Sequence, residues 1–189
     1  MTSPNRRWLG RLLLAVSFLK SSPLYAQAME VGGSVGLARV EAVERKLSVS
    51  GGMFASAGVE FSAHDRSDRY AFFADYSHWA RLLPSRSPTI TGVDFACLGG
   101  RIHGPNLPGG VRGFVDLAWG VGQYRSRQPT GKETIFGYMY GGGVIVPIGD
   151  RWYVRPQFRG YFVAIPEPSG GDYSALGAWS LRVGVGIRL

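Results

Sequence analysis

The segment Asp75-Tyr76-Ser77-His78 contains the residue types of a nucleophilic hydrolase site: an acid, a hydroxyl and an imidazole. Such a site requires the hydroxyl within reach of a histidine that the acid orients. If this segment is a strand, alternation sends Asp75 and Ser77 to one face and His78 to the other. We therefore expect no catalytic residues.

The three histidines, His64, His78 and His103, lie on different segments with no carboxylate or thiol at ligand spacing. Metal sites need such donors grouped around one point. The sequence therefore predicts no metal site and no cofactor.

The segments that carry these residues are predicted to be strands. Apolar and glycine-rich segments alternate with clusters of Gly, Pro, Asp, Ser and Arg, as in all-β chains. The expected strands are 30–40, 48–63, 69–81, 89–103, 110–125, 133–147, 151–164 and 173–189. In the fourth strand we expect a bulge around residues 98–102, where the alternation is least regular.

The last strand alternates most strictly, in the stretch WSLRVGVGIRL. A terminal segment this regular indicates that its pairing matters, and we expect it to close a sheet by pairing with the first strand. The apolar side of this terminal assembly strand is formed by Leu181, Val183, Val185, Ile187 and Leu189.

The residue types on the less apolar side of the strands distinguish a soluble sandwich from a membrane barrel. A solvent-facing surface would carry many Lys and Glu residues, whereas lysine after residue 28 occurs only at Lys46 and Lys132. Gly, Ala and Ser with isolated charges suit the narrow interior of an eight-stranded barrel. The sequence therefore predicts an all-β, eight-stranded antiparallel up-and-down transmembrane β-barrel whose apolar side faces lipid.

The alternation of side chains between the two faces of each strand predicts which charged residues fill the lumen. We expect them to form a network that closes the pore, because confined charges need partners. Its expected members are Asp75, Asp94, Asp116, Arg155, Arg159 and Arg182. Six aromatic residues are expected to face lipid or lie in the interfacial girdles: Trp79, Trp119, Tyr138, Trp152, Phe162 and Trp179.

The first 28 residues differ from the rest. Three arginines precede a short apolar run, residues 12–19, and Ala26 and Ala28 follow, which is the order of a secretory signal peptide. We expect cleavage after Ala26 or Ala28, which assigns residues 1–28 to the signal peptide and 29–189 to the barrel domain. Four of the 21 basic residues lie in this segment; the remaining 17 against 13 acidic residues make nucleic acid an unexpected partner.

The hairpin GGGVIVPIGDRWYVRPQFRGYF, from Gly141 to Phe162, and the terminal strand resemble the small eight-stranded outer-membrane β-barrels of the OmpA/OmpX type. The resemblance implies export through a signal peptide, insertion by the barrel-assembly machinery and residence in the outer membrane of a diderm bacterium. The chain ends in Leu189, where that family usually has an aromatic residue.

Together these patterns predict a monomeric structural or interaction protein with a side-chain-plugged lumen and no catalytic step, in contact with outer-membrane lipid and lipopolysaccharide. Two alternatives remain open. One is a narrow channel or a carrier of small hydrophobic ligands, and the other is a lipid-modifying outer-membrane enzyme.

Overall fold

The computed structural model describes residues 28–42, 52–82, 90–126, 132–166 and 173–189. These residues form eight strands and one short 3₁₀ turn. Their bounds are β1 Ala28–Ala42, β2 Gly52–His64, β3 Tyr70–Arg81, β4 Ile90–His103, η1 Pro108–Gly110, β5 Arg112–Ser126, β6 Lys132–Ile148, β7 Trp152–Pro166 and β8 Tyr173–Arg188.

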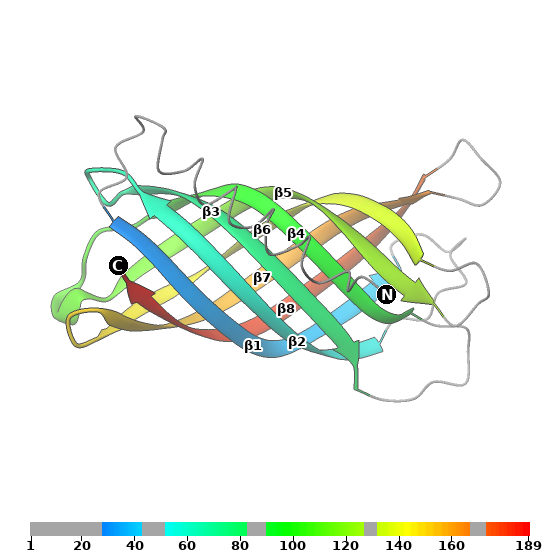
Figure 1. Cartoon of the computed structure of the whole chain (residues 1–189), viewed down its shortest axis with the longest axis horizontal. Helices are drawn as coiled ribbons and strands as arrows, with labels where there is room; N and C mark the ends of the chain where they lie inside the picture. The colour runs from blue at the N-terminus through cyan, green and yellow to red at the C-terminus, as the bar shows by residue number, and fades with distance from the viewer. Residues whose placement is uncertain (1–27, 43–51, 83–89, 127–131, 167–172) are drawn as a thin grey trace, which may run out of the picture.

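The strands form a closed barrel in chain order, with every neighbouring pair antiparallel (Figure 1). β8 closes it against β1, in a register that places Glu30 opposite Arg188. The backbone N–H of Leu189 donates to the carbonyl of Met29 at 2.9 Å, so pairing continues past the last strand residue. The predicted eight-stranded up-and-down barrel, closed by its terminal strand, is confirmed.

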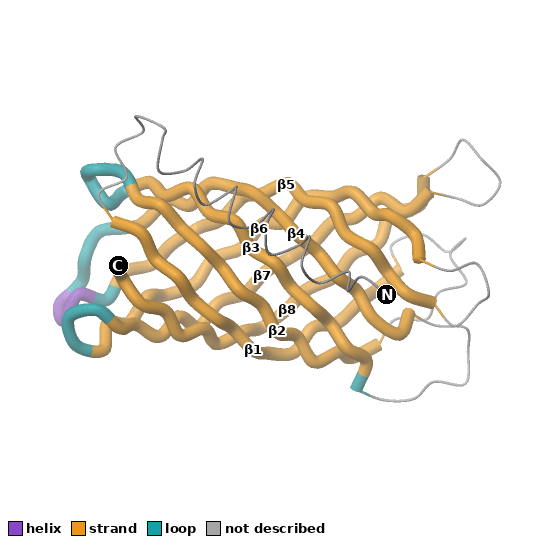
Figure 2. The backbone as a smooth tube through the Cα atoms, viewed as in Figure 1, coloured by secondary structure: helices purple, strands orange, loops and turns teal. Residues whose placement is uncertain are grey.

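The two ends of the barrel differ, and we name them by their connections. At the short-turn end lie the connections 65–69, 104–111 and 149–151, together with the start of β1 and the end of β8 (Figure 2). The opposite end, the loop end, carries the connections 43–51, 83–89, 127–131 and 167–172, which lie outside the described residues. The expected signal peptide also lies outside them, except for Ala28, which begins β1.

Alternation gives the barrel an apolar outer wall. Phe72, Leu98 and Trp119 point outward and are 68%, 72% and 78% exposed. Charged residues such as Glu60 and Arg159 point inward and are almost fully buried. This arrangement, apolar outside and charged inside, suits a barrel surrounded by lipid. Among the described residues, no helix is long and apolar enough to cross a membrane.

The bulge in β4 lies elsewhere than expected. Its register with β5 shifts between Ile90 and Gly92, whereas pairing through residues 98–102 is continuous. Gly92 and Val93 are both buried, so the phase of alternation changes before Asp94. The expected inward position of Asp94 is therefore wrong, because the shift places this residue on the outer wall.

Candidate functional site

The lumen is the candidate functional site, and its loop-end half is apolar. Phe54, Phe95 and Ile135 are each 1% exposed and belong to one buried cluster that crosses the barrel interior. Trp79 packs edge-on against Tyr161, with ring centroids 4.8 Å apart. The expected lipid-facing position of Trp79 is wrong, because it shares the inward parity of Ser77 on β3. This half of the lumen offers water few polar partners.

The middle of the lumen holds an ion-pair network centred on Glu60, on β2. Its carboxylate accepts hydrogen bonds from Arg101 at 2.9 and 3.1 Å, from Arg155 at 2.5 Å and from Arg159 at 2.5 Å. Arg101 also forms a forked pair of hydrogen bonds to Asp116, at 2.7 and 2.8 Å. Forked arginine–carboxylate pairs fix both partners in orientation. Four strands are thereby tied together across the lumen.

Asp75, on β3, extends the network toward β8. Its carboxylate lies 2.8 Å from Arg159 Nη1 and 3.7 Å from Arg182 Nη1, and accepts a hydrogen bond from Ser77 at 2.6 Å. Arg182 also donates to the hydroxyl of Tyr161 at 2.7 Å. This last contact joins the ion pairs to the apolar half of the lumen.

Five of the six residues expected in the lumen network lie there: Asp75, Asp116, Arg155, Arg159 and Arg182. Sequence reasoning left out Glu60 and Arg101. Alternation with Ser56 and Ser62 places Glu60 on the inner side of a regular strand, but the expected network did not include it. Arg101 was not predicted because the bulge was expected at residues 98–102. A register shift there would have left it open whether the Arg101 side chain points into the lumen or outward.

Asp94 belongs to a different cluster, on the outer wall near the loop end. Its carboxylate accepts hydrogen bonds from Tyr76 at 2.8 Å and Arg125 at 2.7 Å, and lies 2.7 Å from His78 Nδ1. Tyr76 and the His78 and Arg125 side chains are 41%, 42% and 48% exposed. Polar groups on the lipid-facing side are tolerated best close to the membrane interface.

A third polar cluster lies at the short-turn end. Asp68, in the β2–β3 turn, accepts hydrogen bonds from Arg112 and contacts His64 Nδ1 at 2.6 Å. Burial alone raises the pKa of Asp68, but the hydrogen bonds from His64 and Arg112 outweigh it and hold this pKa well below its usual range. Glu30 accepts a hydrogen bond from Arg188 at 2.9 Å. Strands far apart in sequence are therefore held together at this end.

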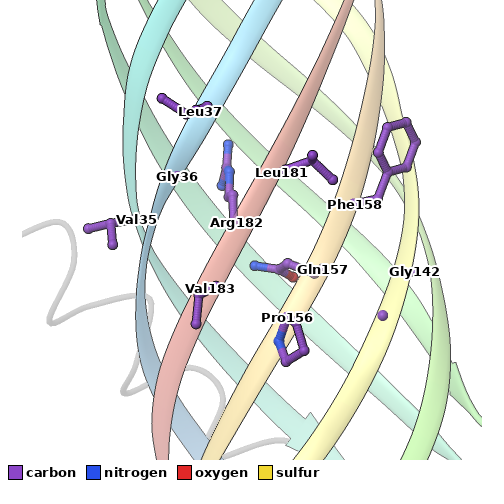
Figure 3. A pocket seen from close by; sticks show the side chains of 11 residues that line it. Val35, Gly36, Leu37, Gly142, Pro156, Gln157, Phe158, Leu181, Arg182 and Val183 are labelled. Atoms are coloured by element: carbon purple, nitrogen blue, oxygen red, sulfur yellow. The ribbon is translucent and has the colours of Figure 1, made fainter.

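A hollow lies in the outer wall of the barrel. It lies where Pro156 interrupts β6–β7 pairing, between the pairs Gly143–Gln157 and Val146–Val154. Figure 3 shows the side chains around it, including Leu37, Phe158 and Leu181. The exposed members of this lining are apolar, so the hollow offers contacts to lipid chains and no arrangement for chemistry.

A closed eight-stranded antiparallel barrel with an apolar outer wall and a charged, filled interior has the fold of the small outer-membrane β-barrel proteins. Comparison with solved structures identifies individual members of that class. Neisserial surface protein A aligns with a TM-score of 0.67 at 12% identity, over 85% of this chain and 97% of that one.

Two further barrels are similar at a comparable level. The N-terminal β-barrel domain of Pseudomonas aeruginosa OprF gives a TM-score of 0.57 at 14% identity, over 86% of this chain and 97% of that one. Ail, the attachment invasion locus protein of Yersinia pestis, gives 0.53 at 10% identity, over 86% and 98%. No family model and no curated protein sequence matches the chain. At these identities the likeness establishes the fold.

Proposed function

We propose that this chain is an outer-membrane protein with a structural or interaction role, a closed lumen and no catalytic step. The observation that carries this proposal is the filled interior. An apolar layer containing Phe95 and Trp79 lies over the ion-pair network of Glu60, so water and solutes meet two successive barriers. A barrel of eight strands leaves only enough width for its own side chains.

Location and assembly belong to the same proposal. The N-terminal segment with its basic residues and apolar run supports export. The pairing of β8 with β1 supports recognition of β8 by the barrel-assembly machinery before closure. In the membrane, the protein acts as a monomer surrounded by lipid and lipopolysaccharide. Ail, which has this fold, has been crystallised with the heparin analogue sucrose octasulfate, which supports an interaction role for such barrels.

Planar-bilayer recording tests the closed lumen. We expect the refolded protein to insert without stepwise conductance, while a large general porin inserted under the same salt and voltage conducts. Reproducible unitary steps from the purified protein would overturn the closed-lumen part of the proposal. Recovery of the expressed protein from the soluble periplasm would overturn its location.

A narrow channel is the second candidate, and buried polar atoms favour it. Both amide atoms of Gln157, Arg155 Nε and Arg182 Nε have no hydrogen-bond partner among the described residues. Buried polar groups without a protein partner are usually bound to water. A hydrated path along this side of the lumen would give small, ion-selective steps in the same recording.

The pair formed by His78 and Asp94 is the observation that favours a lipid-modifying enzyme. An acid that orients an outward-facing imidazole supplies two of the three parts of a hydrolase site. Among the described residues, no serine or cysteine hydrogen-bonds to His78. Incubation of the folded protein with lipopolysaccharide and phospholipid, followed by mass analysis, tests this function. Unchanged lipid masses are expected.

A further inference from the structure

The short-turn end brings together two histidines that the sequence places far apart. His64 ends β2 and His103 ends β4, and their rings are stacked with centroids 5.1 Å apart and an interplanar angle of 8°. Asp68 reaches both rings from the β2–β3 turn. One possible ligand atom from each of the three residues lies within 4.8 Å of the others. The expectation that the histidines have no carboxylate at ligand spacing is therefore wrong, because the turn folds Asp68 back onto the strand ends.

Asp68 orients both imidazoles in the same way. Its backbone carbonyl lies 2.9 Å from His103 Nδ1, and its carboxylate lies 2.6 Å from His64 Nδ1. Because a carbonyl oxygen can only accept, His103 carries its proton on Nδ1. Histidines that bind metals through Nε2 usually donate Nδ1–H to a carbonyl or a carboxylate in this manner.

The Nε2 atoms of the two rings differ in their contacts, and His64 Nε2 lies 3.4 Å from the Ser62 hydroxyl. His103 Nε2 is buried and has no hydrogen-bond partner among the described residues, and its residue is 3% exposed. Glu30 Oε2 is also buried, and its contact among the described residues is an ion pair with His64 Nε2 at 3.3 Å. Arg188 binds the other oxygen of Glu30, which leaves Oε2 directed at the imidazole.

Asp68 also has an uncommon backbone conformation. Asp68 has φ of 54°, the only positive φ of a non-glycine residue in the described part of the chain. This conformation is uncommon for a residue with a side chain, and it places the carbonyl and the carboxylate of Asp68 on the same pair of rings.

We infer that this end of the barrel binds one divalent transition-metal ion, of the zinc class, through His64 Nε2, His103 Nε2 and the Glu30 carboxylate. Asp68 is a positioning residue that holds both rings. Zinc–nitrogen bonds are about 2.0–2.1 Å long, so the parallel rings must tilt toward each other on binding. Three protein ligands leave a fourth position of a tetrahedral site for water.

The charges around the site select among metals. The carboxylates of Glu30 and Asp68 are balanced by Arg188 and Arg112, whose guanidinium groups contact them. With neutral imidazoles, the site therefore has no net charge to attract a hard cation. Calcium and magnesium require several oxygen ligands, whereas imidazole favours zinc, copper, nickel and cobalt. The site should discriminate against Ca²⁺ and Mg²⁺.

The experiment uses tag-free protein folded in detergent, stripped of metal and titrated with Zn²⁺ against a chelating dye, with Co²⁺ as a spectroscopic probe. We expect one ion per chain, visible Co²⁺ absorption bands and no displacement by a large excess of Mg²⁺. His103→Gln and Glu30→Gln should each lower the affinity at least about tenfold, and Asp68→Asn should lower it about 10–100-fold.

The matched control is His78→Gln, which removes a histidine that also contacts a carboxylate but lies at the opposite end of the barrel. It should bind Zn²⁺ as the unaltered protein does. Each variant is first shown to be folded by its heat-dependent gel mobility. If the unaltered folded protein binds no Zn²⁺, or if folded His103→Gln and Glu30→Gln bind as tightly as His78→Gln, the site does not exist. In that case the cluster only ties β2, β4 and β1 together.

Discussion

Arg159 occupies the position in the lumen where three carboxylates converge. Its guanidinium contacts Glu60 at 2.5 Å and Asp75 at 2.8 Å, and lies 3.8 Å from Asp116. The side chain is fully buried, so no solvent replaces these contacts when it is removed. A buried charge that loses its partner is far more costly than an exposed one.

We therefore expect Arg159→Met to lower the free energy of unfolding by about 3–5 kcal/mol, because it leaves buried carboxylates unmatched. Arg151→Met is the control, since Arg151 lies exposed in the β6–β7 turn and should cost under about 1 kcal/mol. Urea unfolding of both variants in the same lipid measures the difference. Equal midpoints would show that the lumen network does not stabilise the fold.

At the scale of the strand, glycines permit the close approach of β6 and β7. A Cβ added at Gly143 would lie 2.3 Å from the Pro156 carbonyl oxygen and 2.9 Å from Phe114 Cζ. Neither the backbone of β7 nor a buried ring can move aside at little cost. At Gly100, on the outer wall, the same atom would meet nothing within 4 Å.

Gly143→Ala should accordingly destabilise the barrel by about 1–3 kcal/mol through overpacking, and Gly100→Ala should change stability by no more than about 0.5 kcal/mol. Unfolding midpoints of the two variants in one detergent provide the comparison. A Gly143→Ala protein as stable as Gly100→Ala would mean that the two strands are less closely packed than described.

The terminal strand completes the barrel through its last residues. Ile187 pairs with both Val31 and Trp152, and the Leu189 N–H reaches Met29. Deleting residues 187–189 removes this pairing and two apolar side chains, each contributing roughly 1.5–3 kcal/mol when fully buried in lipid. We expect the yield of folded, membrane-inserted protein to fall sharply while export continues.

Heat-dependent gel mobility of membrane fractions measures that yield. Leu107→Ala serves as the control, because Leu107 is an exposed residue of the β4–β5 connection and makes no strand pair. A truncated chain that inserts as well as this control would argue against a role of the last residues in assembly.

For the whole molecule, the central question is whether water-soluble compounds reach the lumen. Cys97 tests it, because it is a free thiol on the inner face of β4 and is 3% exposed. In a closed barrel, we expect a charged thiol reagent to label Cys97 at least about tenfold more slowly than after denaturation. The control is a protein that carries both Cys97→Ser and Ser67→Cys. Its single thiol lies in the exposed β2–β3 turn and should be labelled rapidly in the folded state. Rapid labelling of native Cys97 would indicate a water-filled lumen.

The sequence by itself determined the features that depend on local alternation. Strand number, the apolar outer wall and the inward positions of Asp116 and Arg159 all follow from period two, because each strand shows its own pattern. Closure of the barrel was also predictable, since a terminal strand with an apolar side and unpaired backbone groups needs a partner in lipid.

Only the tertiary structure decided what depends on register and on turns. A shift at the start of β4 moved Asp94 to the outer wall and Arg101 into the lumen, because one extra residue reverses every later side chain of a strand. The contacts of His64 with His103 and with Glu30 depend on how three strands end relative to one another around the barrel. No local pattern encodes that alignment, because it results from the summed pairing of all eight strands.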